Sequence, residues 1–353
     1  MTELFSKLYS QLEQNLPFVI YSKPNDHVSN GLFQQNDTLH ELESENSSGF
    51  VFASFYNDVN YIIPIAESEL ISVENTIKEV QYNEFEQSFT QEAKTDFENL
   101  VSLFVKEIRS GSCSKIVASR CEKFELKDFD VEKSFKRMVY LYPTAFKYCF
   151  FHPEIGMWLG ATPEQLLKVN NNEISTVALA GTKTINELEK EWGEKEKIEQ
   201  QLVTNFISES LEPFVDKLTL SEPYTYQAGK LLHIKTDIKA ILKDNNHKDK
   251  VVQVLHPTPA VCGFPKDYAR DFIIKNEGYA RDFYAGFLGE WNFKINEKHT
   301  TDTDLFVNLR CCKIEDQVAK IFIGCGITED SNPELEFIET VNKSETIKKY
   351  YNE

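Results

Sequence analysis

The sequence contains little that would suit an oxidising compartment or a membrane. Its 353 residues include seven cysteines, an odd number with no CxxC pair and no metal-ligand spacing to histidine. We therefore expect reduced, mostly buried thiols. No stretch approaches the ~18 consecutive apolar residues of a membrane span. The opening MTELFSKLYSQLEQNL carries acids and lacks the basic start and apolar centre of a secretory signal. These absences predict a soluble, cytoplasmic protein that does not bind membranes.

Basic residues are also scarce. The chain has 38 Lys and Arg against 56 Asp and Glu, for a formal net charge of -18, and its cations are scattered. Nucleic acid is therefore not an expected partner. No GxGxxG or GxxxxGK[ST] lies between a strand pattern and a helix pattern, so these nucleotide-binding loops are not expected. For an anionic substrate, a few local cations or a metal ion would have to overcome the negative field of the protein.

Hydrophobic spacing predicts helices in three places. Residues 92–109 carry an apolar face and are followed by Gly111, which ends a helix well. A long polar helix is predicted over about 187–211, and a third over the segment that begins at 333. Residues 1–88 look polar and irregular, with strand-like runs at GFVFASF and VNYIIPI. The segment LHPTPAVCGFPK is expected to be a loop because of its prolines.

Strand patterns occur in runs after residue 114. They are SKIVASRCEKFEL, AFKYCFFH, GMWLGA, LLKV, EISTVALAGT, GKLLHIKT, DFYAGFLGEWNF, LFVNLRCCKI and KIFIGCGIT. This order lacks the regular alternation of strand and helix that a doubly wound parallel sheet requires. The hydrophobic content of 41% can fill one large core, and no repeat or linker follows residue 90. We expect one α+β domain over residues 1–353, with large antiparallel or mixed β-sheets packed with peripheral helices.

The segment SNPELEFIETVNK carries the most informative local pattern. Asn332 is a good N-cap and Pro333 suits the first helical position. On that helix Glu336, Glu339 and Lys343 fall on one stripe. One interpretation is an exposed face on which Glu339 and Lys343 form an ion pair worth ~0.3 to 0.5 kcal/mol. The other is a pair of carboxylates that holds a hard cation, with the lysine neutralising an anionic ligand.

Nine stretches taken in order resemble the motifs of the chorismate-utilising enzymes, and most closely those of isochorismate synthases. They are SKIVASR, WLGATPEQLL, ALAGT, KEKIEQQLV, LLHIKT, LHPTPAVCGFPK, RDFYAGFLG, FVNLRC and GCGITEDSNPELEFIETVNK. Nine ordered motifs are far more specific than any one of them. The resemblance implies the fold of that family, with residues 91–353 as the catalytic core and residues 1–90 as a variable N-terminal portion.

The resemblance also implies a Mg²⁺ ion that bridges the ring carboxylate of chorismate. Glu199 and Glu339 match its ligands from two separated helices, and Glu336 is close enough to bind directly or through water. A few glutamates with a substrate carboxylate are a ligand set that Mg²⁺ prefers. Many relatives have histidine where this chain has Gln200, a departure that concerns the tuning of the ligand and leaves the ligand itself in place.

The implied reaction is the reversible conversion of chorismate to isochorismate, an isomerase activity. Water adds at C2 of the ring and the C4 hydroxyl leaves from the opposite face, so a base and an acid are needed. Lys115 matches the base, provided that burial and charge lower its pKa, and Glu164 matches the acid, provided that an apolar setting raises its pKa. Without the motifs, Lys115 would be a solvent-facing strand residue and Glu164 a first-turn helix residue.

The substrate-binding residues follow from the same matches. Arg310 and Tyr284 match the pair that grips the enolpyruvyl carboxylate, and His233 matches a histidine near the C4 hydroxyl. Taken singly, each of these three could be a structural residue. The remaining matches, where backbone or an amine approaches the carboxylates, are Gly181, Thr182, Gly324, Gly326 and Lys343. The long interval between Tyr284 and Arg310 predicts an extended hairpin loop around NEKHTTDTD.

Particular positions separate the members of the family. Ala180 stands where aminodeoxychorismate synthases commonly carry a nucleophilic lysine, and the HPTPAVCGFPK loop has the isochorismate synthase form. Salicylate synthase, which eliminates pyruvate after forming isochorismate, is the alternative. A non-catalytic binding protein would be expected to lose at least one of Lys115, Glu164, Glu199 and Glu339, and all four are present. We expect a monomer without a glutaminase partner, and both menaquinone and siderophore biosynthesis stay open as pathways.

Overall fold

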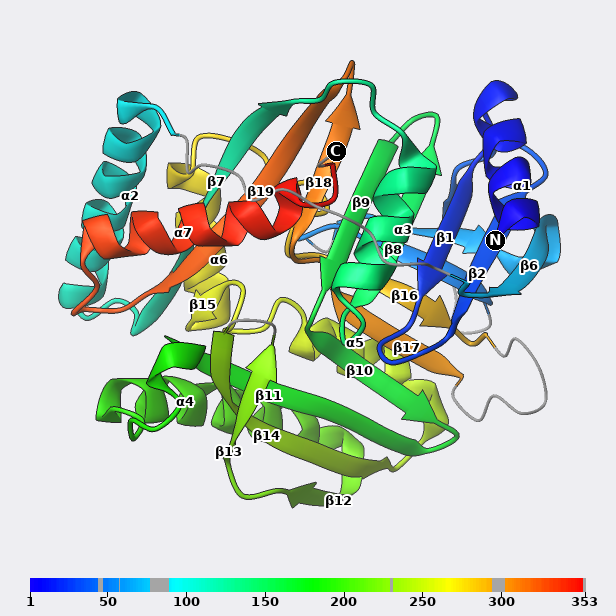
Figure 1. The fold of residues 1–353 in the computed structure, drawn as a ribbon. Helices are drawn as coiled ribbons and strands as arrows, with labels where there is room; N and C mark the ends of the chain where they lie inside the picture. The colour runs from blue at the N-terminus through cyan, green and yellow to red at the C-terminus, as the bar shows by residue number, and fades with distance from the viewer. Residues whose placement is uncertain (44–46, 57, 77–88, 229–230, 294–301, 352–353) are drawn as a thin grey trace.

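The computed structural model describes residues 1–43, 47–56, 58–76, 89–228, 231–293 and 302–351. Within them the chain forms two large β-sheets with helices on their outer sides (Figure 1). Every pairing between the described strands is antiparallel. The predicted α+β class is confirmed, and the sheets are antiparallel.

The first sheet has nine strands in the order β15-β7-β19-β18-β9-β8-β1-β2-β6. Their bounds are Gly263–Phe264 for β15, Lys115–Glu125 for β7, Val318–Ile327 for β19, Cys311–Glu315 for β18, Gly156–Thr162 for β9, Phe146–His152 for β8, Phe18–Ser22 for β1, Val28–Gln34 for β2 and Ser68–Glu74 for β6. Several of these strands are buried on both faces, because helices cover the outer side and the second sheet packs against the inner side.

The second sheet runs β12-β14-β11-β10-β17-β16-β4-β5-β3, with β13 paired to β14. Its strands are Val215–Leu220 for β12, Leu231–Leu242 for β14, Glu173–Thr184 for β11, Gln165–Asn170 for β10, Thr303–Val307 for β17, Phe287–Trp291 for β16, Gly49–Ala53 for β4, Asn60–Pro64 for β5, His40–Glu41 for β3 and Tyr224–Ala228 for β13. Between the two sheets lies an aromatic core in which Phe52 stacks on Phe150 and on Phe283, at ring-centroid distances of 4.3 and 4.4 Å.

The helices fall into three groups. Thr2–Glu13 (α1) and Val131–Leu141 (α3) pack on the outer face of the first sheet and form a second core there. Gln91–Arg109 (α2), Lys266–Asn276 (α6) and Pro333–Lys348 (α7) lie beside β7 and β19, with α7 crossing in front of them (Figure 1). Glu194–Leu211 (α4) packs on β11 and β14 of the second sheet, and Lys248–Leu255 (α5) packs on α4.

The predicted elements agree with the structure best after residue 90. The helices expected at 92–109 and from 333 are confirmed as α2 and α7. The long polar helix begins at Glu194, later than expected, because residues 185–187 form a separate short turn and Gly193 caps the helix. The proline-rich segment was expected to be a loop, but its residues Gly263 and Phe264 form the short strand β15, which pairs with β7. The hairpin loop around NEKHTTDTD lies largely outside the described residues.

The two strand-like runs expected within residues 1–88 are confirmed as β4 and β5, but the prediction of irregular structure was wrong for most of the rest of that segment. It forms α1 and six strands, of which β1, β2 and β6 belong to the first sheet and β3, β4 and β5 to the second. Residues 77–88 lie outside the described part. This interleaving favours the single-domain interpretation, which stays a prediction.

Two expectations from composition can also be compared with the structure. All seven cysteines are free, and all except the partly exposed Cys121 are buried, as predicted. Among the described residues, no helix is long and apolar enough to cross a membrane.

One buried lysine contacts no carboxylate in the structure. Lys147 on β8 is 1% exposed, and its ammonium donates to the backbone carbonyls of Lys23 at 2.9 Å and Pro143 at 3.4 Å. Burial lowers the pKa of Lys147 to about 8, with a small opposing effect of Asp26. The charged form is therefore less favourable in the folded protein than in the unfolded chain.

The Lys147→Met substitution tests this cost through its pH dependence. Below pH 8 the wild type carries the full penalty of the buried charge, and the penalty disappears as pH rises toward the unfolded pKa near 10.4. The free energy of unfolding of the variant minus that of the wild type should therefore fall by about 2 to 4 kcal/mol between pH 7 and 10.5. Urea unfolding at several pH values measures it, with the exposed Lys239→Met as control. A difference that does not change with pH would contradict this account.

Candidate active site

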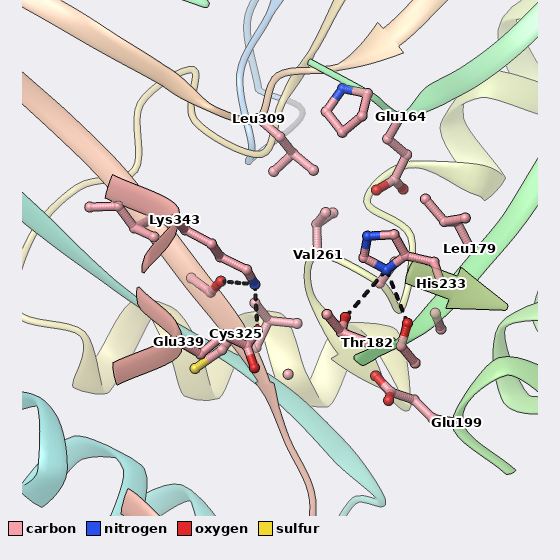
Figure 2. Close-up of a pocket in the computed structure, with 18 of the residues that line it drawn as sticks. Glu164, Leu179, Thr182, Glu199, His233, Val261, Leu309, Cys325, Glu339 and Lys343 are labelled. Atoms are coloured by element: carbon pink, nitrogen blue, oxygen red, sulfur yellow. Dashed lines mark hydrogen bonds and ion pairs between the residues drawn. The ribbon is translucent and has the colours of Figure 1, made fainter. Parts of the chain in front are cut away.

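One cavity of about 190 Å³ brings together every residue that the sequence singled out for the site. These residues are Lys115, Glu164, Gly181, Thr182, Glu199, His233, Tyr284, Arg310, Gly324, Gly326, Glu336, Glu339 and Lys343. They come from β7, β11, β14, β19, α4, α7 and the loops between strands, so the cavity lies where the ends of both sheets meet two helices. Figure 2 shows Glu164, His233 and Lys343 around one shared space.

Lys115 enters the cavity because of how β7 pairs with β19. Val117 lies opposite Gly326 in this register, and a Cβ atom at position 326 would be 2.9 Å from Lys115 Cε and 3.3 Å from Glu199 Oε1. Glycine therefore leaves room for the ion pair between Lys115 Nζ and Glu199 Oε1, 2.7 Å long. Lys115 is 3% exposed, so its interpretation as a solvent-facing strand residue was wrong.

Helix α7 presents its polar stripe to the cavity. Asn332 caps the helix by accepting from the backbone N–H of Leu335, as the sequence predicted. Glu339 Oε1 and Lys343 Nζ form the expected ion pair at 2.6 Å, and Lys343 also donates to the Gly324 carbonyl at 2.9 Å. Burial alone would raise the pKa of Glu339, but the nearby charge of Lys343, with smaller effects of Arg310 and His233, lowers it. Glu339 is therefore an ionised carboxylate in the wall of the cavity.

Glu164 lies between β9 and β10, in a connection that begins at Pro163. It is 9% exposed, and burial raises the pKa of its carboxyl to about 7, opposed by the positive charge of Lys115. The alternative that placed Glu164 in the first turn of a helix was wrong, because the residues after it form a strand. A carboxyl group that is half protonated near neutral pH can donate a proton.

The backbone of β11 orients the ring of His233, and burial keeps this ring neutral. The pairing of β11 with β14 shifts register between Ala180 and Lys183, and Gly181 takes a φ of +71° at this bulge. Its carbonyl lies 3.0 Å from His233 Nδ1, and Thr182 Oγ1 lies at 3.3 Å. Since a carbonyl only accepts, Nδ1 carries the proton and Nε2 is an acceptor. Burial lowers the pKa of His233 to about 4.

Arg310 and Tyr284, from two loops, line the same cavity. The backbone of Arg310 is left-handed, with φ +49°, and burial lowers the pKa of its guanidinium. Tyr284 is buried, and its ring stacks on Phe322 with centroids 5.6 Å apart. A Cβ atom at Gly324 would approach Tyr284 Oη to 2.7 Å, so glycine gives this hydroxyl its place.

A buried ion pair supports these walls from behind. Arg281 pairs with Glu277, and both side chains are about 1% exposed. The remaining guanidinium donors bind the carbonyls of Val261 at 3.0 Å and Val117 at 2.8 Å, both in residues that line the cavity. Because these charges are paired and hydrogen-bonded, they join β7 rigidly to the proline-rich loop.

Sequence reasoning missed several lining residues. The chemically important one is Glu196, which precedes Glu199 by three residues on α4, just as Glu336 precedes Glu339 on α7. This repeated spacing was a signal that could have found it. The other missed residues, mostly apolar, are Val117, Pro163, Leu179, Ala260, Val261, Leu309, Phe322, Ile323 and Cys325.

The four glutamates of α4 and α7 determine whether a metal can bind. Among the described residues, no three His, Cys, Asp or Glu side chains are close enough to hold a metal ion by themselves. Glu199 and Glu339 each pair with a lysine in this structure. Carboxylate oxygens are nevertheless the donors that Mg²⁺ prefers, and Mg²⁺ usually takes only one or two of them beside water and substrate oxygens. The donor set fits such an ion in its chemistry.

Gln200, the residue that replaces the histidine of many relatives, does not line the cavity. Its side chain is buried and donates to the hydroxyls of Thr204 at 2.8 Å and Thr236 at 2.7 Å. It therefore ties α4 to β14, and acts on Glu199 only through the position of the helix.

Comparisons with known proteins agree with this arrangement. A family model described as chorismate binding enzyme matches residues 58–350. The salicylate biosynthesis isochorismate synthase of Pseudomonas aeruginosa is 31% identical over 71% of this chain and 53% of its own length. Isochorismate synthase MenF of Escherichia coli is 30% identical over 71% of this chain and 59% of its own length. The chain thus spans about half the length of the curated relatives it matches.

Solved structures resemble the chain over nearly its whole length. The menaquinone-specific isochorismate synthase MenF of Escherichia coli superposes with a TM-score of 0.77 at 21% identity, covering 96% of this chain and 89% of that one. Anthranilate synthase component I of Streptococcus pneumoniae gives 0.68 at 18% identity, covering 94% and 90%. These likenesses show a shared fold. Together with the family model, they establish that the chain belongs to the chorismate-binding enzyme family.

Proposed function

We propose that the protein is an isochorismate synthase, an isomerase that converts chorismate reversibly to isochorismate. The observation that carries the proposal is the cavity in which a buried lysine and a half-protonated carboxyl, Lys115 and Glu164, share one space with a cluster of cations and carboxylates. The names of the relatives from Pseudomonas aeruginosa and Escherichia coli support the same activity.

Lys115 and Glu164 would divide the proton transfers between them. Lys115 accepts a proton from the attacking water while the new bond forms between its oxygen and C2. Glu164 gives its proton to the C4 hydroxyl as that C–O bond breaks and the ring double bonds shift, so that water leaves. In the present structure Lys115 Nζ donates to Glu199 as part of an ion pair, and the ammonium has to lose a proton before its nitrogen can accept one from water.

The remaining polar residues would bind the substrate. Arg310 and Tyr284 bind the enolpyruvyl carboxylate, which a planar guanidinium can hold by two hydrogen bonds. His233, whose Nε2 accepts, receives a hydrogen bond from the C4 hydroxyl. Lys343, together with backbone groups near Gly181, Thr182, Gly324 and Gly326, meets the ring carboxylate. Glycine at positions 181, 324 and 326 allows the backbone to come close to the substrate.

Glu199 and Glu339 would hold a Mg²⁺ ion, with Glu336 and Glu196 beside them. When bound, the ion neutralises these carboxylates and polarises the ring carboxylate of the substrate. It also offsets the negative field that the net charge of -18 creates for a dianionic substrate. Water as the nucleophile requires no ammonia supply, so we expect the chain to act as a monomer without a glutaminase subunit.

A product assay tests the proposed function. Chorismate, Mg²⁺ and the protein should give isochorismate on chromatography, and an excess of EDTA should abolish the conversion because the carboxylates then repel the substrate. Salicylate with pyruvate as the main product would contradict the proposal in favour of a salicylate synthase. Binding of chorismate without any turnover would favour the non-catalytic binding protein.

Removal of the acid or the base should affect turnover more than binding. Lys115→Ala and Glu164→Gln are each expected to lower kcat by about 10² to 10⁴-fold, the typical contribution of a positioned acid or base. Steady-state kinetics measures the loss. Lys123→Ala on the exposed part of β7 and the exposed Glu173→Gln are the matched controls. Losses below about tenfold in both site variants would show that the roles are assigned wrongly.

The pH profile should report Glu164. Its proton is present below the pKa of about 7 and is lost as pH rises through that value, so kcat/KM for chorismate should fall above pH 7. Measurement of kcat/KM from pH 5.5 to 9 gives the profile. The residual activity of Glu164→Gln should lack this alkaline limb, since an amide does not titrate. An unchanged limb in that variant would assign it to another group.

A further inference from the structure

The polar stripe of α7 continues past the residues that the proposed function uses. Glu336, Glu339 and Lys343 are followed at the same three- and four-residue spacing by Thr346 and Tyr350. Helix α7 ends at Lys348, and Tyr350 follows its C-cap, Lys349. The N–H of Tyr350 still donates to the carbonyl of Ile347 at 2.9 Å, so the chain continues to turn there. The last two members of the stripe therefore point to the same side of the helix as the glutamates.

Both of these residues contact Arg310. Tyr350 Oη donates to the Arg310 carbonyl at 3.0 Å, and the Arg310 guanidinium donates through Nη1 to Thr346 Oγ1 at 3.4 Å. The end of α7 thus touches Arg310 at its main chain and at its side chain. The bond to Thr346 is long, which leaves the strong donors of the guanidinium for a ligand.

The main chain of Arg310 needs such support. A left-handed φ of +49° is unfavourable for a residue with a Cβ and persists only where contacts determine it. Besides Tyr350, the Arg310 carbonyl accepts from the N–H of Ala161 on β9 at 3.2 Å. Gly160 makes this approach possible, because a Cβ there would be 3.3 Å from the same oxygen and 2.7 Å from Tyr148 Cε1.

Tyr350 is itself fixed by packing. Its side chain is 1% exposed, and its ring meets the edge of Tyr142 at a centroid distance of 5.6 Å. The hydroxyl of Tyr142 in turn donates to the carbonyl of Thr346 at 2.7 Å. Tyr142 therefore holds the end of α7 in the position from which Tyr350 reaches Arg310.

We infer that Tyr350 and Thr346 are positioning residues that set the orientation of Arg310 for an anionic ligand. The inference rests on the proposed function in that Arg310 is taken to bind the substrate's enolpyruvyl carboxylate. One helix then fixes both ends of the ligand, because Lys343 meets the ring carboxylate while the end of the same helix aims the guanidinium.

The Tyr350→Phe variant tests this role with the least disturbance. It keeps the buried ring and removes only the donor to Arg310, so KM for chorismate should rise about three- to tenfold, the size expected for one lost neutral hydrogen bond, while kcat stays within about twofold. Tyr351→Phe is the matched control, since its hydroxyl contacts Cys312 and not Arg310. Thr346→Val removes the side-chain contact and should also raise KM; it serves if Tyr350→Phe folds poorly.

A double-mutant cycle distinguishes positioning from a merely structural effect. If Tyr350 acts through Arg310, adding Tyr350→Phe to Arg310→Gln should not raise KM further. The inference would be overturned if Tyr350→Phe and Thr346→Val both had the KM of the wild type, or if the effects of Tyr350→Phe and Arg310→Gln were fully additive. Either result would leave the proposed function intact.

A wild-type protein that binds chorismate without turnover would overturn the proposed function. The dissociation constants of the same variants, from titration calorimetry with chorismate, would then decide the role of Tyr350. A protein that neither converts nor binds chorismate would overturn both.

Discussion

The site depends on one constraint, the register in which β19 pairs with β7. This pairing sets Gly324 opposite Ser119 and Gly326 opposite Val117, so that Lys115 and the glycines share one end of the sheet. A slip of one residue would turn the side chains of β19 to the other face and would place side-chain atoms where Lys115 and Glu199 meet. Since β19 leads directly to α7, the same register also determines where the stripe of glutamates lies.

The charges around the cavity are arranged so that no carboxylate has to be buried alone. Glu199 and Glu339 have lysine partners, while Glu164 lacks so close a cation and has a raised pKa instead. These are the two ways in which a protein can bury an acid. The contrast separates the carboxylates by chemistry, because the charge of Lys343 lowers the pKa of Glu339, which suits a cation, whereas Glu164, with a pKa of about 7, can carry a proton near neutral pH and suits acid catalysis.

Local signals predicted the parts of this protein whose structure depends on near neighbours. The cap and first turn of α7, the apolar face of α2 and the ion pair between Glu339 and Lys343 all follow from spacings of three or four residues. The pair between Lys115 and Glu199 spans 84 residues, and it joins β7 of the first sheet to α4, which packs on the second sheet, so only the long-range arrangement of the two sheets brings it together. All the site residues that the motifs predicted line the cavity, but the spacing of the motifs could not show which of these residues contact one another. Among the N-terminal strands, β4 and β5 were recognised as strand-like runs, whereas β1 and β2 were missed because strands buried on both faces do not alternate and look like irregular apolar runs.

The way the first residues are shared between the sheets has a consequence for biosynthesis. Strand β4, at residues 49–53, receives a neighbour on one side only when β16, at residues 287–291, has been made. With translation at about 5 to 20 residues per second, the edge of β4 that later pairs with β16 stays without this partner for roughly 10 to 50 s. Long-range pairings also slow folding, because the closure entropy of the intervening loop precedes any gain from contact. In the nascent chain, the backbone N–H and C=O groups along this edge of β4 therefore stay unpaired until the second half of the protein has been made.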